Sequence, residues 1–259
     1  ITTDKKGEGI LENLPAGDYT VKETKVPAGY FIDGTTYPVK VTPGETVAVG
    51  SKDQPVYGRI SIQKSDKETG KAESQSSDKG FAGAEYTVYA AEKNRDYEKD
   101  QEAAVLTLNE DGKAVSGDLI HGKYYVKETK APAGYLLDGN KYPVTLSDTA
   151  KEIKVYPVES AVQVIRGNIE LIKAEDGTLD RMANVKFSIT NKLTGESHVF
   201  ITDENGYYST AAEWNKHTQN TNKGESPEDG IWFGGSDPDD GKGALPYGVY
   251  TIEELRCEA

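Results

Sequence analysis

One segment of this chain occurs twice with almost the same letters, and this repetition constrains the fold more than any other feature. Residues Leu14 to Tyr30 read LPAGDYTVKETKVPAGY, and residues Leu119 to Tyr135 read LIHGKYYVKETKAPAGY. An internal repeat of this kind indicates a string of similar modules. A chain of 259 residues then favours modules of roughly one hundred residues each.

The repeated segment has the residue pattern of a half-buried β-strand. Tyr19, Val21 and Glu23 alternate with polar residues, so these three side chains share one face of a strand. A carboxylate on an apolar face is costly unless a cation, a hydrogen bond or a proton compensates its charge. Each module is therefore expected to supply a partner for this glutamate.

A lysine at the end of an opening strand is the expected partner. The segment GRISIQK alternates isoleucine with polar residues and ends on Lys64, which therefore shares the inward face. Lys64 and Glu128 of the second motif strand are expected to meet in the core. In the third unit, GNIELIK and YTIEE place Lys173 and Glu254 in the same two positions.

These motifs divide the chain into three units. The first, residues 1–57, is expected to lack its opening strands and to close with a strand at 45–49. The second, residues 58–165, contains every motif. The third, residues 166–259, is expected to lack its closing strand and carries an insertion at 211–243.

The composition excludes several classes of function. The formal net charge is -13 at pH 7, which argues against binding to nucleic acid phosphates or to an anionic membrane surface. The single cysteine, Cys257, excludes an intramolecular disulfide and a four-cysteine metal site. The sequence has no long apolar run, so we predict no membrane insertion.

Four motifs in combination resemble a known family. They are a GxIxIxK opening strand, a GAxYxVY strand, a TDxxG turn and an LPxGxYxVxExxAPxGY motif strand. Together they resemble the Cna B-type, or SpaA-like prealbumin-like, domains of Gram-positive surface proteins and pilins. The third unit also looks like the repeats of large VaFE-type anchored proteins of gut Firmicutes. The resemblance implies an all-β chain of tandem small β-sandwich (prealbumin-like, Ig-like) domains, and the period-two alternation agrees with it.

The resemblance also implies a self-directed chemistry. In this family an inward lysine may bond covalently to an Asn or Asp of the last strand, while an inward glutamate shuttles the proton. Lys64 and Glu128 match in the second unit, Lys173 and Glu254 match in the third, and Glu23 matches in the first, whose lysine strand is missing. Burial favours a neutral lysine that can attack and a protonated glutamate that can polarise the carbonyl.

The acceptor residue departs from the family pattern. The family places it two residues after a Val-x-Val of the closing strand, where the first unit has Ser51 and the second has Pro157. Neither can accept the bond, and the carboxylates of Asp53 and Glu159 lie two residues further along. We therefore predict that the inward lysine and glutamate of the second unit form a buried pair without a crosslink. No residue is predicted to be catalytic.

The insertion of the third unit gathers residues that suit a ligand site. Long loops are often binding loops or disordered, and aromatic side chains exposed on a rigid sandwich make good hot spots. In the other interpretation the tryptophans close the core, because the run IWF alternates poorly with polar residues. The candidate ligand-binding residues are Trp214, His217, Asn220, Trp232 and Phe233.

No metal or cofactor is predicted. Asp237, Asp239 and Asp240 form an acidic run with too few ligands for calcium, so a solvated turn is expected. His198 and His217 have no partner at the spacing of a metal site or catalytic triad, and both are expected on the surface. The sequence also lacks a phosphate-binding glycine loop and a nucleophile elbow. We predict that the protein is not an enzyme.

The predicted function is structural and adhesive. We expect a region of a secreted, cell-wall-anchored bacterial adhesin, in which neighbouring modules form a rigid stalk, because the junctions contain no flexible Gly/Ser linker. The alternative is that this region itself binds a host extracellular protein. An immunoglobulin, bound in a superantigen-like manner, or collagen or another glycoprotein would contact the insertion or the Tyr-rich strand faces.

Overall fold

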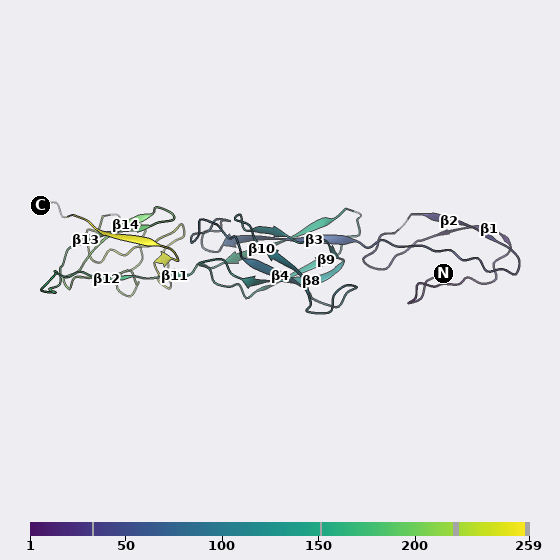
Figure 1. Cartoon of the computed structure of the whole chain (residues 1–259), viewed down its shortest axis with the longest axis horizontal. Helices are drawn as coiled ribbons and strands as arrows, with labels where there is room; N and C mark the ends of the chain where they lie inside the picture. Colours follow the sequence, from purple (N-terminus) through teal and green to yellow (C-terminus); the bar gives the residue numbers. More distant parts are fainter. Residues whose placement is uncertain (33, 151, 220–222, 257–259) are drawn as a thin grey trace.

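The chain forms three groups of strands placed end to end, with the first and third groups at opposite ends of an elongated molecule (Figure 1). The computed structural model describes residues 1–259 except 33, 151, 220–222 and 257–259. The described residues form strands and turns without a helix, and hence without a helix that could cross a membrane. The prediction of an all-β fold class is confirmed.

The second group is a sandwich of two sheets. In the first sheet β10 pairs with β3 in parallel, and β6 and β7 pair with β3 in antiparallel. The second sheet is antiparallel in the order β5-β4-β8-β9. The strands of the first sheet are β3 (Tyr57–Asp66), β6 (Lys113–Val115), β7 (Leu119–Ile120) and β10 (Lys154–Val162). Those of the second sheet are β4 (Glu85–Ala90), β5 (Glu102–Thr107), β8 (Gly122–Lys130) and β9 (Lys141–Leu146).

The core of this sandwich follows from the alternation of its strands. Ile60 and Ile62 of β3 are buried against Tyr86 of β4 and against Tyr124 and Val126 of β8. The same alternation continues past the apolar residues, so the next inward position on each strand is polar. This places a charged residue from each sheet inside the sandwich.

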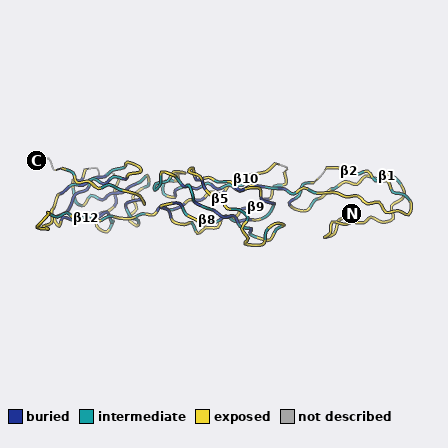
Figure 2. The backbone as a smooth tube through the Cα atoms, viewed as in Figure 1, coloured by how far each residue is buried: buried dark blue, intermediate teal, exposed yellow. Residues whose placement is uncertain are grey.

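The first group is a hairpin with little core. β1 (Gly17–Lys22) pairs with β2 (Thr36–Val41), and Tyr30 bridges to Pro55. Most of its residues are exposed, as Figure 2 shows. The prediction of a closing strand at 45–49 is wrong, because these residues form no strand. In the second group the closing strand pairs with β3, and the described part of the first group contains no counterpart of β3.

The third group consists of small sheets around a second core. β11 pairs with β16, β12 pairs with β15, and β13 lies between β14 and β17. Ile231 and Phe233 of the insertion pack into this core with residues of β13 and β14. The strands are β11 (Arg166–Gly167), β12 (Glu170–Ile172), β13 (Lys186–Asn191), β14 (Ser197–Ile201), β15 (Tyr207–Ser209), β16 (Leu245–Pro246) and β17 (Tyr250–Glu254).

One tyrosine contact recurs in all three groups. The hydroxyl of the first motif tyrosine donates to the carbonyl oxygen four residues earlier, at 2.9 Å for Tyr19, 2.8 Å for Tyr124 and 2.7 Å for Tyr250. The bond fixes the turn that leads into the motif strand. The third group therefore keeps the local structure of the repeat even though its insertion departs from it in sequence.

The first and second groups are joined by backbone hydrogen bonds. The amide of Val56 donates to the carbonyl oxygen of Gly29 at 2.8 Å, and the amide of His121 donates to the carbonyl oxygen of Val56 at 3.3 Å. Gly29 belongs to the PAGY turn of one group, and His121 belongs to the turn before the motif strand of the next. The linker residue thus contacts both groups.

The second junction repeats these contacts. The amide of Ile165 donates to the carbonyl oxygen of Gly134 at 2.8 Å, and the amide of Tyr247 donates to the carbonyl oxygen of Ile165 at 2.7 Å. Gly134 has a φ of +79°, and a Cβ there would lie 2.5 Å from the Cβ of Ser76. Glycine is therefore required for the close approach. The strand pairings stay within each group, and the boundaries at 57/58 and 165/166 stay a prediction.

Candidate functional site

Lys64 and Glu128 meet in the core of the second group. Lys64 lies on the buried face of β3, Glu128 lies on that of β8, and both side chains are 0% exposed. The Nζ of Lys64 forms an ion pair with one carboxylate oxygen of Glu128. The other oxygen accepts a hydrogen bond from the backbone amide of Asp138. The structure thus brings together the two residues singled out from the strand patterns.

A chain of hydroxyl groups extends this pair. Lys64 Nζ donates to the hydroxyl of Tyr86 at 2.9 Å, and this hydroxyl donates to Ser160 Oγ at 2.8 Å. Ser160 Oγ in turn donates to Asp138 Oδ2 at 3.1 Å, which also accepts from the hydroxyl of Tyr142. The buried polar groups of this cluster are therefore hydrogen-bonded to one another, as a dry core requires.

Burial and hydrogen bonding shift the pKa values of Lys64, Tyr86 and Asp138. Loss of solvent lowers the pKa of Lys64, and the contact with Glu128 opposes this effect. Burial likewise raises the pKa of the Tyr86 hydroxyl, which stays protonated and able to donate. Burial alone would raise the pKa of Asp138, but hydrogen bonds from Tyr142, the backbone amide of Asn140 and Ser160 outweigh it and keep this pKa low.

The prediction that Pro157 occupies the acceptor position of the second unit is wrong. β10 runs on to Val162, and its parallel register sets Ser160 opposite Lys64, whereas Pro157 lies opposite Ser61 and faces outward. Glu159 is also exposed on the outer face. A serine side chain has no acyl carbon for an amine to attack, so the residue facing Lys64 cannot accept an amide bond.

The equivalent positions of the other groups are less buried. Lys173 Nζ lies 2.7 Å from Glu254 Oε2, with side chains that are 26% and 49% exposed. Glu23 follows β1 and is half-buried. Ser51 and Asp53, the two positions considered for an acceptor in the first unit, lie in a segment without strand structure.

The insertion residues separate into buried and exposed side chains. Trp232 and Phe233 are 1% and 0% exposed, and His217 is 7% exposed, so these three belong to the interior of the third group. Trp214 is 60% exposed and lies with its ring centre 4.8 Å from that of Tyr207. The candidate Asn220 falls outside the described residues, as does Cys257.

The expectation of two surface histidines is wrong. His198 is 5% exposed, lies 3.0 Å from Glu196 Oε1 and packs edge-on against the ring of Phe233. The ring of His217 lies within hydrogen-bonding distance of the carbonyl oxygens of Thr210 and Asp239. Both histidines are structural. The described residues contain no cluster of His, Cys, Asp and Glu that could hold a metal ion.

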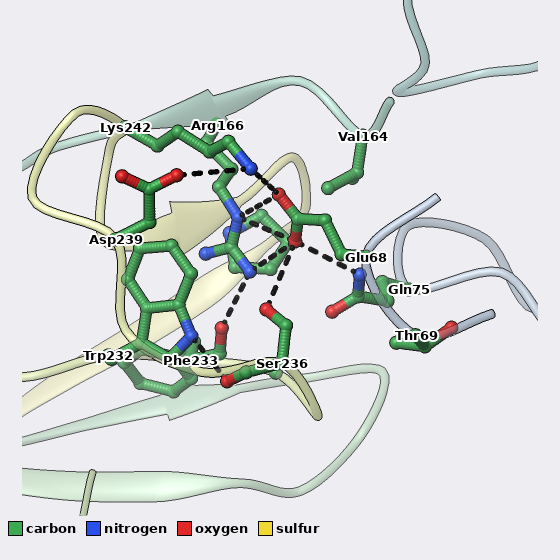
Figure 3. A network of polar contacts seen from close by, with 12 residues as sticks. Glu68, Thr69, Gln75, Val164, Arg166, Trp232, Phe233, Ser236, Asp239 and Lys242 are labelled. Atoms are coloured by element: carbon green, nitrogen blue, oxygen red, sulfur yellow. Dashed lines mark hydrogen bonds and ion pairs between the residues drawn. The ribbon is translucent and has the colours of Figure 1, made fainter. Parts of the chain in front are cut away.

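A second buried ion pair links the second and third groups (Figure 3). Glu68 lies in the turn after β3, and Arg166 opens β11. Their side chains are 3% and 2% exposed. Arg166 Nη2 and Nε donate to Glu68 Oε2 at 2.7 Å and 2.9 Å, and Nε also lies 3.1 Å from Oε1. Such paired contacts between a guanidinium and a carboxylate are strong and directional.

Residues around the insertion enclose this ion pair, as Figure 3 shows. The guanidinium carbon lies 3.7 Å from the ring centre of Trp232, and the guanidinium donates to the carbonyl oxygens of Phe233 and Ala244, each at 3.0 Å. On the carboxylate side, Lys242 Nζ lies at 3.3 Å and Ser236 Oγ at 3.4 Å. The arrangement is a site for one carboxylate. We call these enclosing residues, with Arg166, the carboxylate socket.

The charge of Glu68 is stabilised at this junction. Burial alone would raise its pKa, but hydrogen bonds from Arg166, Gln163 and Lys242 outweigh it and lower the pKa to about 2. Sequence patterns missed this site, because Glu68 lies in a polar turn and Arg166 lies in a linker. The one available signal was the arginine of VIRGNI, a charge between apolar residues.

Comparisons with known proteins agree with the fold. The family model "SpaA: Prealbumin-like fold domain" matches residues 1–55 and 58–159. Among solved structures, the Bacillus anthracis TIE protein is similar, with a TM-score of 0.65 and 26% identity over 98% of this chain and 39% of that chain. The chain thus spans well under half the length of that protein. No curated protein matches the chain.

Two pilins are more distant in structure. A streptococcal ancillary pilin has 14% identity and a TM-score of 0.33 over 94% of this chain and 67% of its own. The shaft pilin SpaA from Lactobacillus rhamnosus GG has 16% identity and a TM-score of 0.31 over 60% of this chain and 81% of its own. The family match confirms the resemblance seen in the sequence motifs. Because the matched residues make up more than half of its length, the chain belongs to the SpaA family of prealbumin-like fold domains.

Proposed function

We propose that this chain is a structural, non-enzymatic region of a Gram-positive surface protein, with modules stacked in series as a stalk. The observation that carries the proposal is the repeated joint, in which one linker residue bonds to the modules before and after it. A linker held by both neighbours restricts their relative rotation, unlike a Gly/Ser-rich linker. The three units 1–57, 58–165 and 166–259 are the modules of this proposal.

The family supports a location outside the cell. The chain matches the SpaA family of prealbumin-like fold domains, and the sequence motifs resemble those of Gram-positive surface proteins and pilins. We propose that the protein is secreted and anchored to the cell wall, with this region between the anchor and a more distant binding part.

The buried Lys64 cluster suits a structural role. Both side chains of the pair are 0% exposed, so an external substrate has no access to them. A buried ion pair adds little net stability, but removal of one partner leaves an uncompensated charge. We propose that Lys64 and Glu128 act as a non-covalent core pair that requires correct pairing of the two sheets.

Binding of a host extracellular protein is the second candidate function, and it rests on Trp214. Among the candidate residues of the insertion that the structure describes, Trp214 alone is mostly exposed. Its ring packs against the ring of Tyr207, and Tyr207 pairs with Ile172 of β12. Ile172 is itself 58% exposed, so the three side chains form an apolar surface. Tryptophan and tyrosine are the residues most often responsible for binding energy at such surfaces.

Small-angle scattering of the full chain tests the stalk. A stiff molecule gives a maximum dimension and a cross-section that match three modules in line. A compact particle, or a broad distribution of dimensions, contradicts the proposal. For the second function, immobilised chain is exposed separately to immunoglobulin and to collagen. The Trp214→Ala variant is expected to retain neither host protein. The control Leu179→Ala, at a residue that is 75% exposed, is expected to retain the host protein that the unchanged chain binds. Equal retention by both variants removes the insertion as the binding site.

A further inference from the structure

We propose that the carboxylate socket of the third unit selects which module can precede it, by accepting only a turn that presents a glutamate at the position of Glu68. The socket is built from Arg166 and from Trp232, Ser236 and Lys242 of or beside the insertion. Its ligand is the turn D-K-E-T-G, residues 66–70, of the second unit.

Contacts within the third unit hold the arginine of the socket. Trp232 stacks on the guanidinium of Arg166, and the carbonyl oxygens of Phe233 and Ala244 hold two of its nitrogens. The Nε edge and part of Nη2 then face the second unit. A guanidinium that is 2% exposed and lacks a carboxylate is an uncompensated buried charge. An apolar residue in the place of Glu68 is therefore rejected.

The turn presents its glutamate in a fixed direction. Asp66 Oδ1 accepts the backbone amides of Glu68 and Thr69 at 2.8 Å and 3.0 Å. Its other oxygen accepts from the hydroxyl of Tyr135 at 2.7 Å and from Gln75 Nε2 at 3.0 Å. Asp66 is 0% exposed, so the base of the turn is anchored in the core of the second unit.

The third unit has a different residue at the position that corresponds to Glu68. Lys173 ends the opening segment GNIELIK as Lys64 ends GRISIQK, so Gly177, four residues after Lys173, corresponds to Glu68. Glycine carries no carboxylate, so a module with the third unit's turn offers no glutamate to the socket of another such module. The glutamate thus distinguishes the two modules.

The inference builds on the proposed serial stalk but concerns only the match between neighbours. The test uses the full chain with Cys257→Ser and spin labels on Glu110→Cys and Glu204→Cys, one exposed residue in each unit. The distance distribution between the labels is then measured. The labelled protein with the unchanged turn is expected to give one narrow peak in this distance distribution. Glu68→Leu, which removes the carboxylate, is expected to lose that peak, and so is the isosteric Glu68→Gln.

Lys67→Leu is the matched control, because it adds the same leucine to the same turn at an exposed position and should keep the narrow peak. A narrow peak at the original distance in Glu68→Leu overturns the inference. Loss of the peak in Lys67→Leu as well shows general damage to the turn and also overturns it. A broad distribution in the unchanged turn contradicts the proposed stalk instead, so the two failures are distinguishable.

Discussion

Ser160 lies directly opposite Lys64 in the parallel pairing of β10 with β3, and both side chains point into the sandwich. Tyr86 connects them, accepting from Lys64 and donating to Ser160. The second unit therefore has a buried lysine, an adjacent glutamate and a facing residue on its last strand. What it lacks is an acyl carbon at the facing position, and one substitution can supply it.

Ser160→Asn is expected to create a covalent bond between the two strands. The asparagine would place a carboxamide carbon opposite an amine whose pKa is lowered by burial, with the Glu128 carboxyl group next to it. Amide formation releases one ammonia. The intact mass of the denatured variant should be lower than the sequence mass by one ammonia, and the unchanged protein should show its full sequence mass.

Two further variants control this prediction. Ser160→Asn combined with Glu128→Gln removes the carboxyl group that would shuttle the proton and should keep its full mass. Ser160→Ala should also keep its full mass. Loss of ammonia from the unchanged protein contradicts the non-covalent interpretation of the Lys64 cluster. A full mass for Ser160→Asn alone means that the strands do not bring the two groups into reacting distance.

Glu128→Gln is expected to destabilise the second unit by about 3–5 kcal/mol, because it leaves the Lys64 charge buried without its partner. The measurement is the free energy of unfolding in denaturant. Glu98→Gln removes the carboxylate of an ion pair whose side chains are about two-thirds exposed and should change little. Replacing both buried partners, as Lys64→Met with Glu128→Leu, should restore most of the loss. Equal effects of the two single changes would contradict a charge buried in the core.

The sequence allowed the strand faces and the Lys64–Glu128 pair to be predicted, because alternation with period two fixes which side chains point inward. It did not allow the facing residue to be predicted. Placing Pro157 at the acceptor position aligns Ile153 and Val155 with the family's inward Val-x-Val, yet they are 42% and 45% exposed. The inward residues are the next ones along, including Ser160, because parallel pairing with β3 sets the register.

The contact between Glu68 and Arg166 could not be predicted from residue patterns, for a different reason. Glu68 and Arg166 are separated by 98 positions, and neither belongs to a strand face with alternating residues. Their contact depends on how two modules are oriented, which the backbone bonds of Ile165 determine. Trp232 was named as a candidate ligand-binding residue, yet it is 1% exposed and stacks on Arg166 of β11.

The junction is expected to weaken only in strong acid. The pKa of Glu68 is lowered from its usual value of 4.5 to about 2, so its stabilising effect is complete above pH 4.5 and is lost as the pH falls towards 2. This depression corresponds to roughly 3 kcal/mol at neutral pH. The basic side chains that face Glu68 are Arg166 and Lys242.

Inter-module distance measured between pH 7 and pH 2 checks this expectation. The narrow distribution should persist at pH 5 and broaden between pH 4.5 and pH 2. Glu68→Gln has no proton to gain, so its distribution should be independent of pH over the same interval. Broadening near pH 6 would point to a histidine and would contradict control of the junction by Glu68.

The two tryptophans are expected to differ in both quenching and stability, because Trp232 is 1% exposed and Trp214 is 60% exposed. With Trp214→Phe, the remaining fluorescence should resist acrylamide, whereas with Trp232→Phe it should be quenched readily. Trp232→Ala removes a buried ring and the surface on which Arg166 stacks, so it should cost about 3–5 kcal/mol of unfolding free energy. Trp214→Ala should change this free energy by about 0.5 kcal/mol or less. Strong quenching in both single-tryptophan variants would mean that the insertion does not close over the junction in solution.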